Sequence, residues 1–583
     1  MAMKSPCRIL LASWLPIMLV ALLAQAPQAA PGDTEIRVED FGAVGDGIAD
    51  DSAALDKAVA ALATAPKPAV LRFGAGRTYR VATGSGYVIS IQNQEGIRIE
   101  GAGATLRLGA GRRAVALRGC RDIVVRGLRV DYDPLPFAEA RVTGVDRASR
   151  TLVARLDPGF ALPPPGGPTQ ARDEQAYFAM LWNPGPHDWL STHFYVADLQ
   201  PAPDEPHSVI VTAGENFKDW GFLQAGTTRI TLPVRGIAHR SGAGEVMALD
   251  GNRDVMLEDV EIWSAPWFAC AVQHNEGNVT LRRVHVRPPP GTSRITSSWR
   301  DGFHVKGNRA RLLFEDCVLQ GMNDDAFNIA TMLSSAVLVK GTGLRVRQNH
   351  PQRYVPWRVG DTLAGYAKAT GTLLEHARVL AVEEGARPNR DSAPPVKLTL
   401  DRTVPGLTAG DQIWAAEAAN PETTLRRCTI RMSCRLQSRV TLEHCDVIGL
   451  LWFYGDPIEG PLPSGSVARH CRLRQGRGNP EIAVGCLGRL YNFPAPTAPG
   501  GTPPLANLLF ENNEIDGRFD LRHARNVQLV NNRFVAGRGT LTIGDCRAVL
   551  LKGNRLGEEA LPASCIRVED PPTRDSLTVH GRN

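Results

Sequence analysis

Short segments that alternate apolar and polar residues recur along most of the chain. Examples lie at 96–101, 122–127, 254–259, 278–283 and 311–316, and the pattern resumes in segments that begin at 424, 440, 467, 507, 526 and 548. Alternation with a period of two predicts β-strands, and each segment ends in turn residues. Because equivalent segments are irregularly spaced, the pattern favours a right-handed parallel β-helix with loops of variable length over a propeller or a leucine-rich repeat.

Two long stretches interrupt this repeat and divide the chain. Residues 136–246 and 335–420 lack the coil pattern, and we expect each to fold as a small antiparallel β-barrel or β-sandwich. The chain then consists of a leader, a cap with the first coils, an insertion, the central coils, a second insertion and the last coils, at 1–30, 31–135, 136–246, 247–334, 335–420 and 421–583. Because the second insertion begins just after Asp325, we expect it to form a wall beside that residue.

The central coils contain a sequence that repeats after 24 residues. Asp-Gly-Phe-His-Val at 301–305 aligns position by position with Asp-Ala-Phe-Asn-Ile at 325–329. Stacked coils lie about 4.8 Å apart, so Asp301, Asp324 and Asp325 should be gathered in one place. Strict alternation would direct Asp324 and Asp325 to opposite faces unless the chain bends there. A solvated turn is the structural alternative, but stacked like charges raise a carboxyl pKa, which favours a functional role.

Aromatic and basic residues are expected beside these aspartates. Extending the alignment upstream places Trp267 next to Gly302, and extending it downstream places Arg431 and Arg435 in the following coil. An acid and a base, a flat face for a sugar ring and donors for hydroxyl groups are what a sugar-cleaving site requires. Further candidates for substrate contact are Arg294, Trp299, His304, Asn328, Trp452 and Glu459. The alternatives are a surface arginine at 294, a loop-packing tryptophan at 299 and a hydrogen-bonding histidine at 304.

Composition agrees with a protein built from strands and turns. Glycine and proline number 57 and 42 among 583 residues, and aromatic residues make up only 6%. The formal net charge is +6, and no local basic cluster beyond short arginine pairs accompanies it. Nothing here therefore predicts a nucleic-acid partner.

Ten of the eleven cysteines follow the leader, but their positions argue against a disulfide framework. The residues that follow a short strand and two polar positions are Cys317, Cys428, Cys445, Cys471, Asn513, Asn532 and Asn554. We therefore expect an inward ladder of small polar groups at one corner of the β-helix, with a disulfide pair as the alternative. The cysteine and histidine spacing of a zinc site is not found.

The first thirty residues have the pattern of a signal peptide. Lys4 and Arg8 precede an apolar run over 9–23, and small residues follow. An uncleaved membrane anchor is the alternative, although the run is short for a span and Pro16 interrupts it. We expect a protein exported to the periplasm or secreted, with no membrane span after cleavage.

Several motifs together resemble a known enzyme family. Residues 38–47 resemble the N-terminal cap of pectate-lyase-like β-helix proteins, and the segments at 263–267, 278–281, 288–294, 301–304, 315–317 and 321–328 resemble the catalytic region of glycoside hydrolase family 110. That resemblance implies an exported β-helix enzyme with β-barrel insertions that removes terminal α-1,3-linked galactose with inversion. It also implies Asp324 as general acid and Asp301 or Asp325 as the base that holds the water. The chain departs from the family pattern at Ala330 and at Arg431–Arg435, so we expect a pocket of altered sugar or linkage specificity.

The expected function is thus glycoside hydrolysis with neither a metal nor an organic cofactor. The substrate would be an oligosaccharide or glycoconjugate with terminal galactose, and a homodimer is left open. The alternatives are a polygalacturonase-like hydrolase, a pectate lyase that needs calcium, and a β-helix that binds carbohydrate or a surface without turnover.

Overall fold

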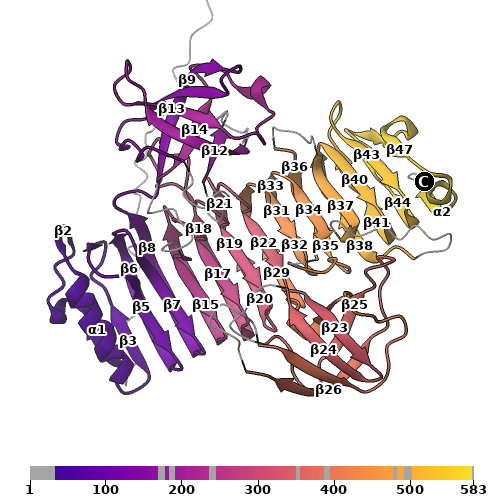
Figure 1. The fold of residues 1–583 in the computed structure, drawn as a ribbon, viewed down its shortest axis with the longest axis horizontal. Helices are drawn as coiled ribbons and strands as arrows, with labels where there is room; N and C mark the ends of the chain where they lie inside the picture. Colours follow the sequence, from indigo (N-terminus) through magenta and orange to yellow (C-terminus); the bar gives the residue numbers. More distant parts are fainter. Residues whose placement is uncertain are drawn as a thin grey trace, which may run out of the picture.

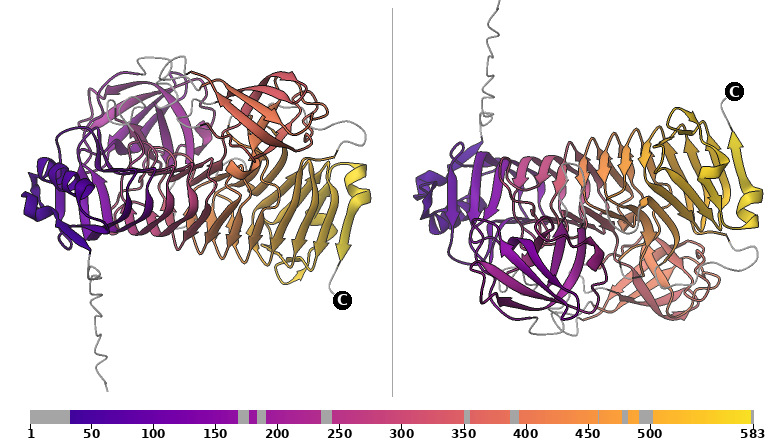
Figure 2. Two further views of the ribbon diagram at one scale, coloured as in Figure 1. Left: turned by 90° about the horizontal axis from the view of Figure 1, so that it is seen from below. Right: turned by 90° about the horizontal axis from the view of Figure 1, so that it is seen from above.

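The computed structural model describes residues 33–167, 177–182, 191–234, 244–349, 355–386, 394–457, 459–476, 482–490 and 502–580. Their strands stack into an elongated parallel β-helix that carries two small barrels. The first barrel lies above the β-helix in Figure 1 and the second below it, and Figure 2 shows both projecting from the same side. The leader and its signal-peptide prediction lie outside the described residues. Helix α1 (Ser52–Thr64) covers the N-terminal end, with Leu55, Ala58 and Leu62 buried against the first coils. The β-helix fold expected from the alternating segments is therefore confirmed.

One face of the β-helix is a sheet of twelve parallel strands. From the C-terminal end to the N-terminal end they are β47 (Ile566–Val568), β43 (Thr540–Gly544), β40 (Arg518–Arg522), β37 (Ile482–Leu490), β34 (Leu451–Gly455), β31 (Cys434–Leu436), β22 (Phe327–Ala330), β19 (Phe303–Lys306), β17 (Cys270–Gln273), β15 (Met247–Asp250), β7 (Arg112–Arg118) and β5 (Gly86–Gln92). Phe303 pairs with Phe327 and His304 with Asn328, which is the register that the 24-residue repeat predicts.

The second large sheet closes the other faces of the coils. Four of its strands are long and bend round a corner: β6 (Glu95–Leu108), β8 (Arg121–Tyr132), β16 (Arg253–Ile262) and β18 (Glu276–Val286). After β18 each coil uses two short strands instead, beginning with β20 (Arg311–Glu315) and β21 (Val318–Gln320), then β29 (Glu422–Arg426) and β30 (Thr429–Arg431). The side chains that point inward from all faces form one continuous apolar core.

A ladder of thiols and amides occupies one corner of this core, as the sequence predicts. Cys471 donates its backbone N–H to Asn513 Oδ1, Asn513 donates to Asn532 Oδ1, and Asn532 donates to Asn554 Oδ1, at 2.9–3.0 Å. Cys445 donates to Cys471 Sγ in the same manner at 3.4 Å. The ten cysteines among the described residues are free thiols, so the alternative of a disulfide pair is not adopted.

Substituting Asn532 by leucine tests this ladder. The change would leave the Asn513 N–H without its acceptor and the Phe510 carbonyl without its donor, both inside the core. Each buried unsatisfied group costs about 1–3 kcal/mol, so we expect the free energy of unfolding in urea to fall by about 3 kcal/mol. Gln528→Leu is the matched control, because Gln528 lies on the exposed side of β41 (Ala524–Val530). Equal losses in the two variants would contradict the structural role of the ladder.

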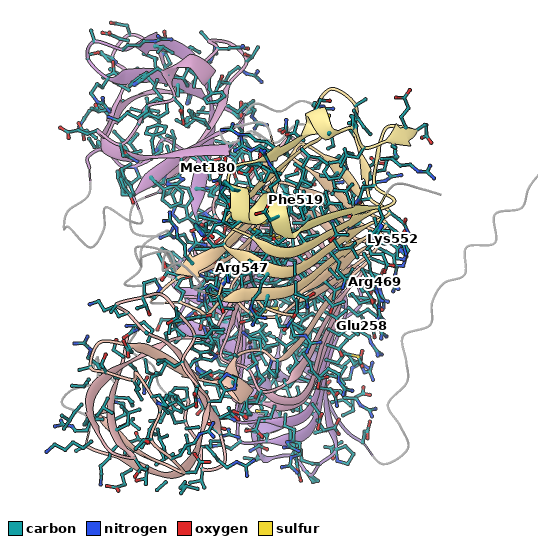
Figure 3. The ribbon with its side chains drawn as sticks, turned by 90° about the vertical axis from the view of Figure 1, so that its right-hand side faces the viewer. Met180, Glu258, Arg469, Phe519, Arg547 and Lys552 are labelled. Carbon is teal, nitrogen blue, oxygen red and sulfur yellow. The ribbon has the colours of Figure 1, made fainter. Side chains whose placement is uncertain are left out.

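Alternating charges line the outer surface of the second sheet. Arg126, Glu258, Arg282, Glu315, Arg426, Glu443 and Arg469 succeed one another, one in each coil, and neighbours form ion pairs. Glu258 and Arg469 are labelled on this face in Figure 3. Opposite charges on directly paired strands stabilise a sheet, so this column supports the stacking that aligns the coils.

Each insertion forms a closed antiparallel barrel. The first contains β9 (Phe137–Asp146), β10 (Thr151–Leu156), β11 (Phe178–Trp182), β12 (Ser191–Pro201), β13 (Ser208–Ala213) and β14 (Arg229–Pro233). The second contains β23 (Ser334–Lys340), β24 (Gly343–Gln348), β25 (Thr362–Tyr366), β26 (Ala377–Glu384), β27 (Val396–Leu400) and β28 (Gln412–Ala415). Each has its own apolar core. No helix in the described part of the chain is long and apolar enough to cross a bilayer.

Candidate active site

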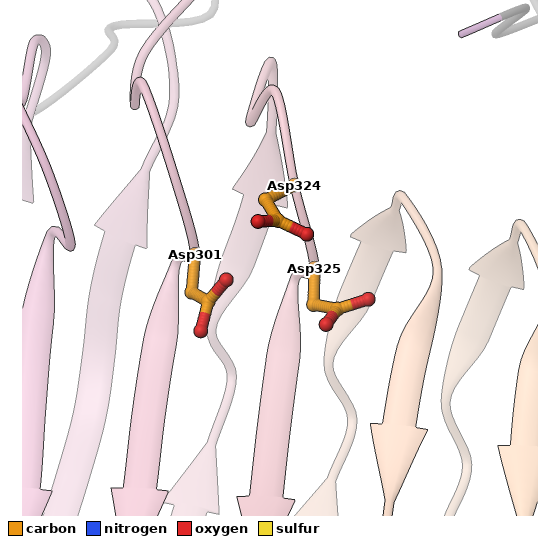
Figure 4. A group of neighbouring side chains, drawn as sticks. All are labelled: Asp301, Asp324 and Asp325. Atoms are coloured by element: carbon orange, nitrogen blue, oxygen red, sulfur yellow. The ribbon is translucent and has the colours of Figure 1, made fainter. Parts of the chain in front are cut away.

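The three aspartates lie together where two neighbouring coils enter the twelve-stranded sheet (Figure 4). Asp301 precedes β19 and Asp325 precedes β22, and one carboxylate oxygen from each aspartate lies within 4.8 Å of the others. The backbone bends at Asn323 and Asp324, which lets Asp324 approach the same space as Asp325. Asp301 and Asp325 are only 2% and 8% exposed, whereas the side chain of Asp324 is 29% exposed.

Asp301 is held by a histidine rather than by a cation. His304 Nδ1 lies 2.7 Å from Asp301 Oδ2, and the imidazole stacks on Phe268 with 4.1 Å between ring centroids. Burial, and then the charge of Lys306, hold the pKa of His304 well below its ordinary value. Burial and the neighbouring Asp324 raise the pKa of Asp301 well above its ordinary value. His304 therefore orients Asp301 through a hydrogen bond, which is the alternative role that the sequence predicts for it.

Asp325 lies against a guanidinium from the next coil. Arg435 pairs with Asn328 in the sheet register, and its Nε is 3.1 Å from Asp325 Oδ2. Burial raises the pKa of Asp325 well above its ordinary value, and Arg435 opposes that rise. Asp301 and Asp325 therefore retain their protons to a higher pH than isolated carboxyl groups do.

Asp324 is paired with an arginine that the first barrel helps to hold. Arg300 Nη1 lies 2.6 Å from Asp324 Oδ2. The same guanidinium lies between two rings, 5.3 Å from the centroid of Phe178 and 5.0 Å from that of Trp267. Phe178 belongs to β11 and also stacks on the buried Trp299 at 4.8 Å. The insertion thus reaches the aspartates through Phe178 and Arg300.

Replacing Phe178 by leucine should therefore weaken catalysis. The change removes one of the two aromatic faces around Arg300, and such contacts are worth about 0.5–2 kcal/mol. We expect kcat to fall about tenfold, and the pH profile of kcat/KM to move because the cation beside Asp324 is no longer fixed. Phe194→Leu is the matched control, since Phe194 is buried in the core of the same barrel. Equal changes in both variants, without a moved pH profile, would contradict this role.

A second network holds Glu459 at the other side of the site. Its Oε2 lies 3.4 Å from both Lys306 Nζ and Arg435 Nη1, and Asn328 donates to it at 3.3 Å. Burial acts to raise the pKa of Glu459, but Lys306 and Arg435 lower it to about 2. Lys306 itself is buried and donates to Asn328 Oδ1 at 2.7 Å. Glu459 is therefore a fixed carboxylate suited to accept sugar hydroxyl groups.

These groups line a pocket of about 290 Å³. Its lining residues are Phe178, His193, Tyr195, Phe268, Arg300, Asp301, His304, Asn323, Asp324, Asp325, Asn328, Arg435 and Glu459. The first barrel supplies one wall. None of these lining residues belongs to the second barrel, so the expectation that the second barrel forms a wall beside Asp325 is wrong. That barrel instead supports the segment that carries Glu459, through Asn349 Nδ2 bonded to the Pro457 carbonyl and Tyr366 bonded to Leu462 N–H.

Five predicted substrate contacts lie outside this lining. The predicted register of Trp267 is wrong by two residues, because Ala269 N–H bonds to the Asp301 carbonyl and Phe268 takes the place beside Asp301. Arg294 pairs with Asp131, Trp299 is fully buried, Arg431 pairs with Asp446 from the other sheet, and Trp452 stacks on Tyr454. The sequence pattern did not identify Phe268, Arg300, Lys306 or Asn323 as residues of the site. Each of the four lies within two residues of a position that the coil pattern predicts, and this proximity is the signal that could have identified them.

Known proteins resemble this chain in parts. Residues 36–110 match a family model described as rhamnogalacturonase A/epimerase, pectate lyase-like, which covers the cap and the first coils. An alpha-1,3-galactosidase A of Bacteroides fragilis is 22% identical over 430 residues, which are 67% of this chain and 66% of that protein. One of Akkermansia muciniphila is 30% identical over 98 residues, 15% of this chain and 16% of that protein. The chain therefore spans just under two thirds of the length of the first of these relatives.

Solved structures also align with the chain. The Agl-KA catalytic domain gives a TM-score of 0.41 at 9% identity and covers 96% of this chain and 70% of that one. A family 28 exopolygalacturonase of Yersinia enterocolitica gives 0.39 at 11% identity and covers 94% and 78%. The resemblance inferred from the motifs is confirmed by the curated relatives. Across 67% of its length, this β-helix chain is similar to proteins named alpha-1,3-galactosidase A.

Proposed function

We propose that the protein is an exported glycoside hydrolase that removes terminal α-1,3-linked galactose with inversion of configuration. The observation that carries the proposal is the group of Asp301, Asp324 and Asp325 in one pocket, with two of the three carboxyl groups buried. The names of the curated relatives support the sugar and the linkage. A pocket of about 290 Å³ is just below the range of roughly 300–1,000 Å³ that is usual for ligand sites, which supports binding of one terminal sugar rather than a longer chain.

Each aspartate has a distinct part in the proposed reaction. Asp324 is the general acid that protonates the departing oxygen, because it is the most exposed of the three and the leaving sugar must reach solvent. Asp325 is the base: burial raises the pKa of its carboxyl group, and Arg435 beside it opposes that rise. Asp301 helps to hold the water: oxygens less than 4.8 Å apart can both hydrogen-bond one water at about 2.8 Å.

The stereochemical part of the proposal has the sharpest test. Inverting pairs usually stand about 6.5–9.5 Å apart and retaining pairs about 5–5.5 Å. The limit of 4.8 Å here joins only one oxygen from each carboxyl group, so the anomer of the first product decides between the two outcomes. Proton NMR during hydrolysis of an α-1,3-linked galactobioside should show β-galactose as the first product. α-Galactose as the first product would overturn inversion. Binding of the sugar without any hydrolysis would instead support the alternative of a carbohydrate-binding β-helix.

Chelation separates this proposal from a calcium-dependent lyase. Arg300 and Arg435 already supply positive charge to Asp324 and Asp325, so hydrolysis should keep its full rate after dialysis against EDTA. Hydrolysis of the galactobioside would be followed by released reducing sugar, and elimination would be tested on polygalacturonate by the ultraviolet absorbance of its unsaturated product. Loss of activity that calcium restores, together with an unsaturated product, would contradict a hydrolase.

A further inference from the structure

A second pocket lies on the first barrel, outside the candidate active site. It measures about 720 Å³ and lies between β9, β10 and the turn that follows β10. Its lining residues are Arg141, Thr143, Arg155, Leu156, Asp157, Pro158, Gly159, Phe160 and His207. None of these residues lines the pocket of the three aspartates. Its volume is within the range of about 300–1,000 Å³ that is usual for ligand sites.

Three arginines stand in a row beside this pocket. In the strand register Arg155 of β10 pairs with Arg141 of β9, and Arg141 pairs with Arg229 of β14. Directly opposed residues share one face of a sheet, and like charges in such pairs destabilise it. Arg229 is neutralised by Glu139 at 2.8 Å and by Asp157 at 2.5 Å.

The other two arginines keep their charge facing the pocket. Arg141 donates to the carbonyl of Gly226 at 3.0 Å, and within the described ranges neither Arg141 nor Arg155 forms an ion pair with an acidic side chain. Asp157, the acid in the lining, is already bonded to Arg229. Two exposed guanidinium groups on adjacent strands therefore face a cavity whose nearest carboxylate is occupied.

The remaining walls suit a sugar that carries an acidic group. Phe160 is half-buried, and its ring offers a flat apolar surface within the lining. His207 is exposed at the rim, where its backbone is held in the left-handed region at a φ of 60°. Guanidinium groups bind carboxylate and sulfate oxygens through paired hydrogen bonds, which lysine cannot match.

We propose that this pocket binds an acidic group on a glycan chain, either a carboxylate or a sulfate ester, through Arg141 and Arg155. The bound chain would lie on the same barrel that supplies Phe178, His193 and Tyr195 to the candidate active site. The pocket would thus retain acidic polysaccharides at the enzyme surface. This binding does not depend on the proposed hydrolysis and can be measured without it.

Affinity electrophoresis tests the proposal with three polymers: polygalacturonate, dextran sulfate and neutral dextran. The wild-type protein should be retarded by at least one acidic polymer and not by neutral dextran. The double variant Arg141→Gln/Arg155→Gln should bind that polymer about tenfold or more weakly, since two charge-assisted contacts are lost. Retardation by polygalacturonate alone identifies a carboxylate, and by dextran sulfate alone a sulfate ester.

Arg345→Gln/Arg347→Gln is the matched control. Both residues are exposed on β24 of the second barrel, and the change removes the same charge. It should leave binding at the wild-type level, and thermal unfolding should show that both double variants fold. Equal loss of binding in the two double variants, or no binding of either acidic polymer by the wild type, would overturn the proposal. Hydrolysis of a small aryl galactoside by the Arg141/Arg155 variant would show separately whether the proposed enzyme activity exists.

Discussion

Asp324→Asn is expected to slow hydrolysis of an α-1,3-linked galactobioside about 10²–10⁴-fold, because an amide cannot protonate the departing oxygen. An aryl galactoside with an acidic phenol needs little protonation to leave. The same variant should therefore lose much less activity on that substrate. Asp325→Asn should lose activity on both substrates to the same extent, because the attack of water is needed in either case. Initial rates on the two substrates, measured for each variant, give this comparison.

The control for these variants is Asp259→Asn. Asp259 pairs with Arg283 at the outer surface of another coil, so its change should leave both rates as in the wild type. Undiminished hydrolysis of the galactobioside by Asp324→Asn, with unchanged sugar binding, would remove the catalytic role from this pocket. If Asp325→Asn instead showed the dependence on the leaving group, the acid would be Asp325 and the roles would be exchanged.

The sequence predicted the fold and the central aspartates because both depend on local repetition. In a parallel β-helix each coil stacks on the preceding one, so a 24-residue repeat directly gives the register of β19 on β22. The same logic predicted Arg435, which continues the column of His304 and Asn328. It also predicted the corner ladder, where a short strand and two polar residues precede each inward thiol or amide.

Other parts of the site depend on distances that the sequence pattern does not contain. The register of Trp267 depended on the length of the loop before Asp301, and an error of two residues put Trp267 beside Gly302, where Ala269 lies. Phe268 is therefore the aromatic residue beside Asp301. Arg431 lies in β30, which belongs to the other sheet, so its position in the next coil did not bring it to the pocket. Phe178 comes from an insertion without the coil pattern, and only the docking of the barrel brings it to Arg300.

Arg435→Leu should produce the second large loss, with a characteristic dependence on pH. Arg435 lies beside Asp325 and Glu459, and its charge lowers the pKa of both. Without it, burial raises the pKa of Asp325 still further, so less of the base is ionised at a given pH. We expect kcat/KM near pH 6 to fall about 10²–10³-fold, with the acidic limb of its pH profile moved to higher pH.

Arg435→Lys distinguishes this electrostatic role from a structural one. Lysine restores the positive charge without the planar guanidinium, so the acidic limb should return toward its wild-type position while part of the rate loss remains. A merely structural role predicts lower rates in both variants with the acidic limb unmoved. Because removing one partner of a buried ion pair also destabilises a fold, thermal unfolding of each variant must accompany the kinetics. A folded Arg435→Leu protein with an unmoved pH profile would show that Arg435 does not act on the base.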